Sequence, residues 1–568
     1  MEKKSEKKSK IYKIVIVSFI FVISLLFLYI NRSYSYNYYE RIEFESAGAK
    51  LYANLYYPSN DLEFQDKHPL VIFAHAFQSQ RDFDLRAPVE LTKRGFFVAS
   101  IDYQGHGESG GNLFNIGDNN LPGLAQDCSN LLDKLETLTI YKNEINSSQI
   151  GLIGHSLGGM VVLMNDALDP RFNATVTWAG LVDLDLGGFG ISEDSIFNDY
   201  IPINLINESN VQNLLIIHHI NDPVLPFEDN ALAAQALTNG TLIQVTTPMF
   251  GMEHLIVSTS LEINTINFFE AIFFNSEDIN GPISVSYYLN YLFLFINLFL
   301  LFLTSMYLAR YFSSFFNLRP MKDTYFIKNE IIEKDNKKTA LRIIGYFLIF
   351  IFTYLFFTIA LGVFALLIGS LILMFSFILF RLMTLYDNTE SKKTFLSTLR
   401  TSILSQFKLN SIGFSMLSAI FFIGFYLIFS ISYPFAFFFP TKLSDFLLAL
   451  TAFPLYVNLE IFYREIIYPE LKIINSKKRR IAIMIGLSAV MQSIIFGITL
   501  SWILVPGFVA TNLVMFVVSV KNTYLYEDTK NFLSTLISSF IIIQIFFGAT
   551  ISSVYGLGQG LSYFLSLT

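Results

Sequence analysis

The sequence has very little cysteine, and its second half has no histidine. Cys128 is the only cysteine in 568 residues, so no disulfide can form within the chain. The histidines all lie before residue 255: His68, His75, His106, His155, His218, His219 and His254. Proton chemistry that needs an imidazole is therefore confined to the first half of the chain.

Charged residues are also scarce. They make up 15% of the chain, whereas hydrophobic residues make up 53% and include 59 phenylalanines. A soluble surface does not tolerate this proportion, so part of the chain must face lipid. The net charge of −7 is mild, and nothing in the sequence indicates a nucleic-acid surface. The length exceeds that of one compact domain.

The chain begins with a basic tail and an apolar run. Lysines crowd residues 1–10, and residues 14–30 are uncharged over a length that can cross a bilayer. No small-x-small cleavage site follows, only Asn31-Arg32-Ser33-Tyr34. We therefore predict that residues 1–31 form a cytoplasmic basic tail and an uncleaved signal-anchor helix.

Residues 32–286 alternate between strand and helix patterns. The expected strands are 41–45, 50–57, 70–75, 97–101, 150–153, 175–178, 214–218 and 242–247. The expected helices are 87–94, 124–138, 160–168, 230–237 and 255–274. Alternation of this kind predicts an α/β domain with a mainly parallel sheet and helices on both faces.

Residues 287–568 are almost wholly compatible with lipid and predict a membrane domain of about eight helices. The expected spans lie near 287–307, 343–361, 363–380, 412–431, 446–462, 481–500, 505–520 and 532–553. Lys and Arg fill every second loop, and the loops between these hold only Lys442. Because positive charge is retained in the cytoplasm, this alternation predicts an integral protein of the cell membrane with residues 32–286 outside the cytoplasm.

One short stretch of the first half carries a candidate nucleophile. An apolar run ends in Gly154-His155-Ser156-Leu157-Gly158, and a pattern typical of a helix follows. Glycine is needed on both sides of Ser156 because the strand and helix backbones pass close together at such a turn. The hydroxyl of Ser156 is then exposed, and the amide of Leu157 at the helix start points toward the position of an oxyanion.

The partners of a serine nucleophile follow in the second part of this domain. A serine hydroxyl needs an imidazole to take its proton, and the imidazole needs a carboxylate to fix its tautomer. Asp222 follows the strand expected at 214–218, and His254 lies in the loop before the last helix. Ser156, Asp222 and His254 are the candidate catalytic residues. Asp183 and Asp185 are alternative candidates for the acid.

These motifs, in this order, resemble those of the α/β-hydrolase superfamily, nearest its monoacylglycerol-lipase-like and dienelactone-hydrolase-like branches. Residues 71–77, Val-Ile-Phe-Ala-His-Ala-Phe, are similar to the His-Gly-x oxyanion loop, with Ala76 where glycine is usual. The resemblance implies that the backbone amides of Phe77 and Leu157 hold the oxyanion. Residues 102–109, Asp-Tyr-Gln-Gly-His-Gly-Glu-Ser, resemble a structural turn of the family, and residues 222–224 resemble its acid loop. We recognise no family resemblance in the membrane half.

The resemblance and the expected membrane spans together predict a membrane-bound serine hydrolase that cleaves an acyl ester, of a lipid or another amphiphile, through an acyl-enzyme. An acyl-peptidase-like serine peptidase and a non-catalytic binding domain of a transporter or receptor are the alternatives. We expect no cofactor and no metal site, because no cluster has metal-ligand spacing that the triad does not explain better. The expected partners are the ester substrate and membrane lipids, and no nucleic acid.

The remaining histidines have expected structural roles. His75, His106 and His155 are expected in turns and around the site. His218 and His219 stand too near the acid to be the base, and we expect them to pack or to bond the loop.

The sequence also allows predictions about two further segments. Residues 181–212, between strand and acid loop, are either a short lid or a plain surface loop. Glu460 and Arg464 predict an intrahelical ion pair at a cytoplasmic helix end. No other span is expected to hold a buried charge.

Overall fold

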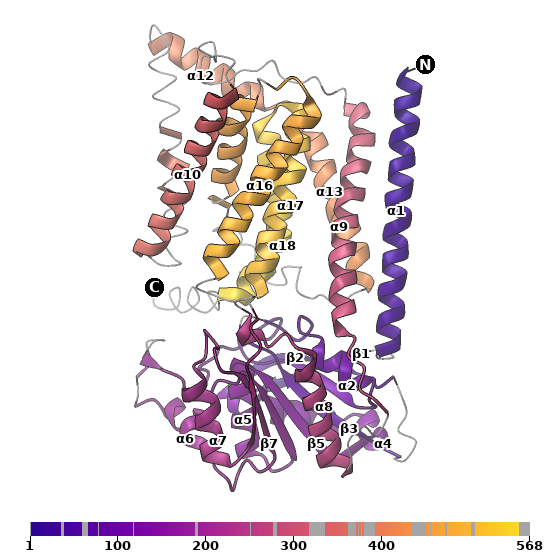
Figure 1. Ribbon diagram of the computed structural model, residues 1–568, viewed down its shortest axis with the longest axis vertical. Helices are drawn as coiled ribbons and strands as arrows, with labels where there is room; N and C mark the ends of the chain where they lie inside the picture. The colour runs from indigo at the N-terminus through magenta and orange to yellow at the C-terminus, as the bar shows by residue number, and fades with distance from the viewer. Residues whose placement is uncertain are drawn as a thin grey trace.

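A globular domain lies at one end of a bundle of helices in the computed structural model, and the N-terminus lies at the far end of the bundle (Figure 1). The structure describes residues 2–35, 39–59, 66–77, 79–117, 119–187, 191–192, 194–249, 252–275, 281–316, 318, 336–361, 392–432, 453–454, 456–471, 474–500 and 506–555, with single positions at 450 and within 371–379.

The domain is built on an eight-stranded sheet in the order β1-β2-β4-β3-β5-β6-β7-β8. β1 pairs antiparallel with β2 and β2 antiparallel with β4, whereas all the other neighbours are parallel. The strands are β1 Tyr39–Ser46, β2 Ala49–Tyr56, β3 His68–Ala74, β4 Phe97–Asp102, β5 Ile145–His155, β6 Ala174–Trp178, β7 Leu214–His219 and β8 Thr241–Val245. All eight expected strands are present. β5 begins five residues before the expected strand. The apolar pattern does not cover this start, because residues 146–148 are polar and partly or fully exposed.

Helices cover both faces of the sheet. α2 (Arg86–Thr92) and α8 (Thr259–Phe274) pack on one face, where Val89 and Phe269 meet Phe73 of β3 in one hydrophobic core. α3 (Asp127–Glu136) and α5 (Leu157–Leu168) pack on the other face, where Leu131 and Val161 form a second core. The fold is therefore the expected α/β class with a mostly parallel sheet.

The smaller helices depart from expectation at identifiable places. The helix expected at 124–138 divides into a 3₁₀ turn at Gly123–Ala125 and α3. The helix expected from residue 255 begins only at Thr259, after Ile256 takes a left-handed backbone conformation with φ 46°. The pattern at 230–237 is a π-helical turn, Glu228–Leu232, followed by α7 (Ala233–Thr238). α4 (Thr139–Glu144) and α6 (Pro202–Leu205) are short and were not expected.

Long helices form the rest of the described chain. They are α1 Glu2–Ser35, α9 Tyr287–Phe312, α10 Asn336–Leu361, α12 Lys392–Gln406, α13 Leu409–Ser432, α16 Lys477–Leu500, α17 Pro506–Thr529 and α18 Phe532–Tyr555. α9 packs between α1 and α13, and α16, α17 and α18 pack in sequence. The span expected at 363–380 lies largely outside the described residues, whereas residues 456–462 of the span expected at 446–462 are helical.

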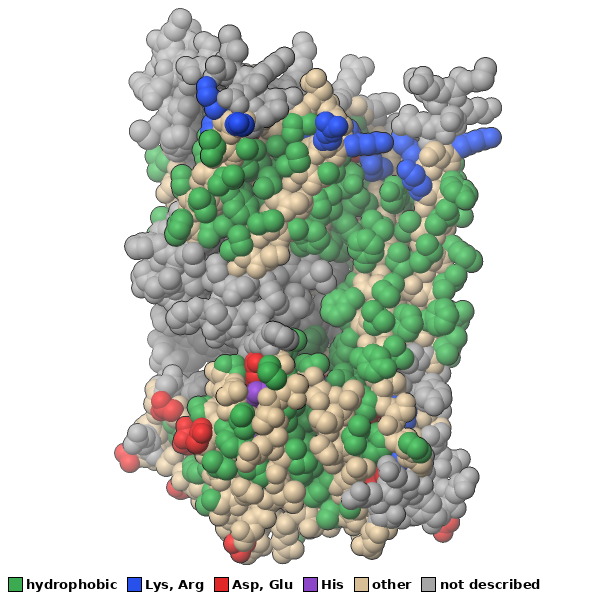
Figure 2. Space-filling model, viewed as in Figure 1, with side chains coloured by type: hydrophobic (Ala, Val, Ile, Leu, Met, Phe, Trp, Pro, Cys, Tyr) green, Lys and Arg blue, Asp and Glu red, His purple; other side chains and the backbone are tan. Residues whose placement is uncertain are grey.

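Three of the described helices are long and apolar enough to cross a membrane. They contain Lys8–Ile30 of α1, Tyr287–Phe312 of α9 and Leu409–Leu427 of α13. Shorter apolar segments lie at Ala340–Phe352 in α10 and Phe532–Ile545 in α18. Lys and Arg side chains gather at the end of the bundle away from the domain, and hydrophobic side chains cover the region between (Figure 2).

The bundle also holds buried charges, among them the ion pair between Glu460 and Arg464 that the sequence predicted. Arg464 is fully buried and bonds Glu460 at 3.0 Å, Thr523 Oγ1 at 2.9 Å and the carbonyl of Ser519 at 3.0 Å. Lys521 was expected in a loop, but α17 continues to Thr529 and buries its side chain against Ser538. Lys521 lies just beyond the span expected at 505–520, so it does not contradict the expectation for the spans themselves. The helix continues past its apolar stretch and carries this polar side chain into the packed bundle.

Candidate active site

Ser156 sits at a strained turn between β5 and α5. Its backbone has φ 55° and ψ −118°, a conformation that non-glycine residues rarely adopt and that is found at functional sites. Its amide donates to the carbonyl of Trp178 at 2.9 Å, and its carbonyl accepts from Leu181 at 2.9 Å. These bonds hold the turn in its unusual conformation at the carboxyl end of the sheet.

The glycines around Ser156 are required by close backbone contact. A β-carbon on Gly154 would overlap the carbonyl of Gly158, and one on Gly158 would overlap the carbonyls of Ala74 and His75. A β-carbon on Gly159 would meet the backbone of Gly180. The Gly-x-Ser-x-Gly spacing therefore lets α5 start directly against β5 and against the loop after β3.

The structure brings together the three side chains that the sequence singled out. His254 Nε2 lies 2.9 Å from Ser156 Oγ, and His254 Nδ1 lies 2.7 Å from Asp222 Oδ2. Asp222 follows β7, and His254 lies in the 3₁₀ turn Glu253–Leu255, which precedes α8. All three residues are buried, although the turn was expected to expose the hydroxyl of Ser156. A chain of this geometry can take a proton from the serine hydroxyl and stabilise the imidazolium that forms.

Asp222 is fixed by more partners than His254. Its Oδ1 accepts the amides of Val224 at 2.8 Å and Leu225 at 3.0 Å, and its Oδ2 lies 3.3 Å from His218 Nε2. Burial alone would raise the pKa of the carboxyl group. Hydrogen bonds from His218 and His254 and from the Leu225 amide outweigh burial and hold this pKa well below its usual value. Asp222 is therefore a carboxylate at neutral pH.

Asp183 and Asp185, the other candidates for the acid, have different surroundings. Both side chains are exposed, and Asp185 Oδ1 accepts the amide of Gly187 at 2.9 Å. The contact between Asp222 and His254 therefore favours Asp222.

The loop after β3 meets the start of α5. Phe77, whose amide was expected to hold the oxyanion, follows His75 and Ala76 in this loop and is partly buried, with its ring 5.7 Å from the His106 ring. Leu157 is the first residue of α5, so its amide is one of the free donors of a helix start. The contact of Gly158 with the carbonyls of Ala74 and His75 brings these two stretches of backbone together.

The turn after β4 is a structural support. Asp102 is buried and accepts the amide of Arg81 at 2.6 Å and the amide of Glu108 at 3.1 Å, and its Oδ2 pairs with the Arg81 guanidinium. Burial opposes ionisation, but Arg81 lowers the pKa of Asp102 to about 2. Ser109 Oγ donates to the carbonyl of Asp102. The turn therefore ties β4 to the loop that carries Phe77.

Three other histidines, His155, His218 and His219, are buried around this site. His155 Nε2 lies 3.1 Å from the carbonyl of His254, and burial lowers the pKa of His155 to about 3, so it is neutral. His219 Nε2 lies 2.9 Å from the carbonyl of Thr247, and His218 Nε2 lies 3.0 Å from that of Leu225. The expected loop contacts of His218 and His219 are present. The contact of His218 with Asp222 was missed, because spacing alone does not tell which way a strand-end side chain points.

Residues 181–212 fold onto the domain in the part that the structure describes. Phe197 and Ile201 are buried in the same core as α5, and the Phe197 ring lies 5.2 Å from that of Phe114. A 3₁₀ turn, Ile196–Tyr200, and α6 give the segment its own structure. No group of His, Cys, Asp and Glu side chains that could hold a metal ion is found among the described residues.

Comparison with known proteins agrees with this architecture. Residues 65–220 match the model of the family described as serine aminopeptidase, S33. The domain has the α/β-hydrolase fold. The finer likeness to a particular branch of this superfamily stays a prediction, as do the domain boundaries at residues 31 and 286.

Individual relatives match only part of this chain. A 2,6-dihydropseudooxynicotine hydrolase of Paenarthrobacter nicotinovorans is 32% identical over 21% of this chain and 30% of its own length. A platelet-activating factor acetylhydrolase of Cavia porcellus is 24% identical over 28% of this chain and 45% of its own. The chain thus spans less than half the length of these relatives. An acylaminoacyl peptidase structure from Pyrococcus horikoshii is 16% identical, with a TM-score of 0.32, over 41% of this chain and 42% of its own.

Proposed function

We propose that the protein is a membrane-bound serine hydrolase that cleaves an acyl ester of a lipid or another amphiphile. The observation that carries this proposal is the hydrogen-bonded chain from Ser156 Oγ through His254 to Asp222 Oδ2. The match of residues 65–220 to a serine hydrolase family supports it. The mechanism needs no cofactor and no metal ion.

The reaction follows from the order of these groups. Ser156 Oγ attacks the acyl carbonyl carbon while His254 Nε2 takes the hydroxyl proton, and Asp222 stabilises the imidazolium. The amides of Phe77 and Leu157 hold the oxyanion of the tetrahedral intermediate. His254 then gives its proton to the leaving alcohol, which departs as the acyl-enzyme forms. Water, deprotonated by His254, attacks the acyl carbon and releases the carboxylic acid and free Ser156.

The amphiphile and the bilayer are proposed from the rest of the chain. α1, α9 and α13 have the length and apolarity of membrane spans, and the basic side chains lie at the end of the bundle away from the domain (Figure 2). Because basic residues are retained in the cytoplasm, we propose that the N-terminus is cytoplasmic and the hydrolase domain extracytoplasmic. A substrate carried in the membrane would then reach the domain from the leaflet beside it.

A peptide substrate is the second candidate, and the description of the matched family, a serine aminopeptidase, favours it. Ester and amide cleavage proceed through the same tetrahedral intermediate, so the triad does not distinguish them. A panel of chromogenic acyl esters and aminoacyl amides, assayed with the full chain in nanodiscs, separates the two. Faster turnover of the amides would replace the ester proposal.

Labelling by a fluorophosphonate tests the enzymatic proposal itself. We expect the probe to label the full chain, to fail on Ser156→Ala and to label the control Ser148→Ala, whose side chain is exposed near the start of β5. Wild-type protein that is folded but unlabelled would instead favour a hydrolase-like domain that only binds its ligand.

A further inference from the structure

The short helix α2 lies between the loop that carries His254 and the first turn of α9. At its start, Arg86 Nη1 donates to the carbonyl of Leu255 at 2.9 Å. The other side of the Arg86 guanidinium is held by Asp84, which accepts from Nε at 2.9 Å and from Nη2 at 2.7 Å. Arg86 therefore joins a fixed carboxylate to the residue directly after His254.

The other end of α2 holds the start of α9. Glu90 Oε1 accepts the amides of Ser286 at 2.8 Å and Tyr287 at 2.6 Å, where the helix begins. A carboxylate at this place satisfies free amides of the helix start and interacts favourably with the helix dipole. Arg86 and Glu90 are four residues apart and so lie on one face of α2. One turn of helix thus connects the His254 loop to α9.

Tyr291, one turn into α9, makes a second connection. Its hydroxyl accepts the amide of Leu85 at 3.1 Å and donates to the carbonyl of Phe83 at 3.1 Å. These two backbone groups flank Asp84, which holds Arg86. The position of the Arg86 guanidinium is therefore set by α9 through both Glu90 and Tyr291.

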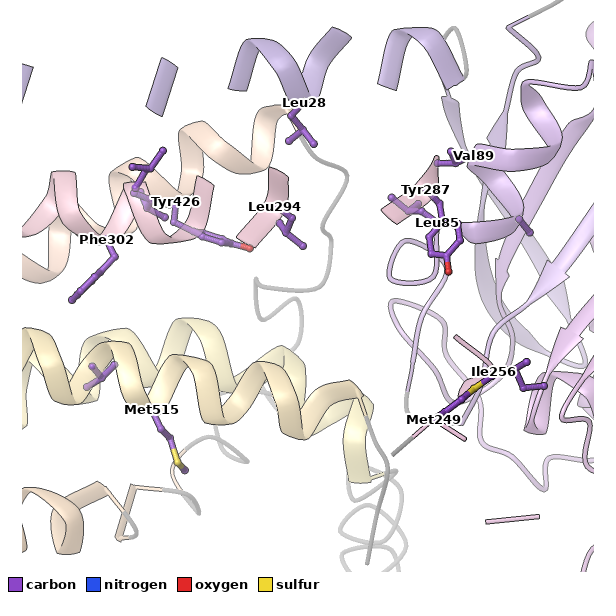
Figure 3. Close-up of a cluster of buried hydrophobic side chains, with 14 of the residues drawn as sticks. Leu28, Leu85, Val89, Met249, Ile256, Tyr287, Leu294, Phe302, Tyr426 and Met515 are labelled. Carbon is purple, nitrogen blue, oxygen red and sulfur yellow. The ribbon is translucent and has the colours of Figure 1, made fainter. Parts of the chain in front are cut away.

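Apolar side chains also pack between α2, the start of α9 and the His254 loop. Leu85, Val89 and Tyr287 belong to one buried cluster that also contains Met249 and Ile256, which lie on either side of His254 in sequence. Figure 3 shows Leu85 and Tyr287 side by side, and Met249 beside Ile256, at the end of the domain that faces the helices. Close-packed interiors transmit a displacement because there is no free space to absorb it.

The His254 loop is held by two consecutive carbonyls. His155 Nε2 lies 3.1 Å from the carbonyl of His254, and Arg86 bonds that of Leu255. His155 belongs to the same turn as Ser156, whereas Arg86 is tied to α9. The distance between His254 Nε2 and Ser156 Oγ thus depends on a group that a candidate membrane span keeps in place.

We propose that Arg86 is a positioning residue for His254 and that α9, through Glu90 and Tyr291, controls its position. The membrane segment is then a regulator of the site as well as an anchor, since a tilt or shift of α9 changes how well His254 meets Ser156. This inference rests on the proposed function, because it assigns the regulation of the same serine and histidine.

The substitution Tyr291→Phe tests the connection with least damage to the fold. It removes one hydroxyl that lies away from the reacting atoms. In nanodiscs, with a soluble short-chain ester, we expect kcat and the rate of fluorophosphonate labelling to fall about fivefold, the effect of one hydrogen bond. KM is expected to stay unchanged, because neither Tyr291 nor Arg86 is part of the proposed reaction steps.

Arg86→Lys provides the second variant. It keeps the charge but lacks the planar fork that reaches Asp84 and Leu255 together. We expect kcat to fall about tenfold, and the double variant with Tyr291→Phe to be no slower than Arg86→Lys alone, because both act through one path. The control is Arg94→Lys. Arg94 is another buried arginine of the domain, and it donates to Glu270 and to the carbonyl of Gly281. Its kcat is expected to match that of wild type, even if its melting temperature falls.

The outcomes separate this inference from the proposed function. Variants with wild-type kcat, effects that multiply in the double variant, or an equal loss in Arg94→Lys would each overturn the positioning role while the enzyme remained a hydrolase. A folded wild-type protein that is neither labelled by the fluorophosphonate nor active on any ester or amide would overturn the proposed function, and the positioning role with it.

Discussion

His218 Nε2 lies 3.3 Å from Asp222 Oδ2, the same oxygen that contacts His254 Nδ1 at 2.7 Å. The acid of the proposed triad thus lies between two histidines. One is the penultimate residue of β7, and the other belongs to the loop before α8. His218 is fully buried and also contacts the carbonyl of Leu225, so it fixes the loop that carries Asp222.

Removing this contact is expected to slow the reaction without abolishing it. His218→Phe fills the same space but cannot donate to Asp222, so we expect kcat to fall about tenfold, the effect of losing one hydrogen bond to a charged group. His218→Gln carries an amide donor and is expected to restore most of the activity. Turnover of a soluble ester measures both variants. Equal rates for His218→Phe and wild type would assign His218 to packing alone.

The identity of the acid can be tested by a matched pair of substitutions. Asp222→Asn keeps the shape but leaves the His254 imidazole with the wrong hydrogen-bond partner, and we expect kcat to fall by about 10⁴. Asp183→Asn changes an exposed side chain after β6 and is expected to leave kcat at the wild-type value. The opposite ranking in single-turnover labelling by the fluorophosphonate would make Asp183 the acid.

Gly158→Ala is expected to destabilise the domain. The added methyl group would overlap the carbonyls of Ala74 and His75, and overpacking of this kind costs about 1–3 kcal/mol. Gly345→Ala in α10 is the control, because a β-carbon at this position has no atom of the described structure within 4 Å. Thermal unfolding in detergent compares the two. A stable, active Gly158→Ala protein would show that the turn around Ser156 is less tightly packed than the structure has it.

The stability of the domain should decrease as the pH rises through neutrality. Burial raises the pKa of the Glu262 carboxyl to about 8, although the Arg86 guanidinium opposes the effect. Between about pH 4.5 and 8 the unfolded chain therefore loses this proton while the folded protein keeps it, so the free energy of unfolding falls as the pH rises across this window. Melting temperatures at pH 5 and pH 8.5 measure the effect.

Glu262→Gln should remove this part of the pH dependence, and its gain in melting temperature over wild type should be larger at pH 8.5 than at pH 5. Glu208→Gln, at an exposed position, is the control. Identical pH dependence of Glu262→Gln and wild type would show that Glu262 does not titrate in this range.

The proposed orientation can be mapped with single cysteines. The one native cysteine, Cys128, is buried, so it gives little background with a thiol reagent. Ser148→Cys places an exposed thiol in the hydrolase domain, and Ser476→Cys places one just before α16. A membrane-impermeant maleimide applied to intact cells is expected to label Ser148→Cys, and to label Ser476→Cys only after permeabilisation. Reversed labelling would place the hydrolase domain in the cytoplasm.

The sequence by itself determined the strands of the domain and the order of its candidate catalytic residues along the chain. Apolar runs of strand length predicted all eight strands, because a buried β-strand needs apolar side chains along a short stretch of consecutive residues. The Gly154 to Gly158 turn, the aspartate after β7 and the late histidine named the three residues that the structure brings together, because parallel strands carry their carboxyl ends to one edge of the sheet.

The tertiary structure decided which polar groups are buried and what they touch. Arg86, Glu262, Arg464 and Lys521 read as ordinary charged residues in the sequence, and their burial depends on helices that come from distant parts of the chain. The contact of His218 with Asp222 and the path from Tyr291 to Leu255 have the same origin. Such contacts depend on side-chain direction and on packing between elements, which local sequence patterns do not encode.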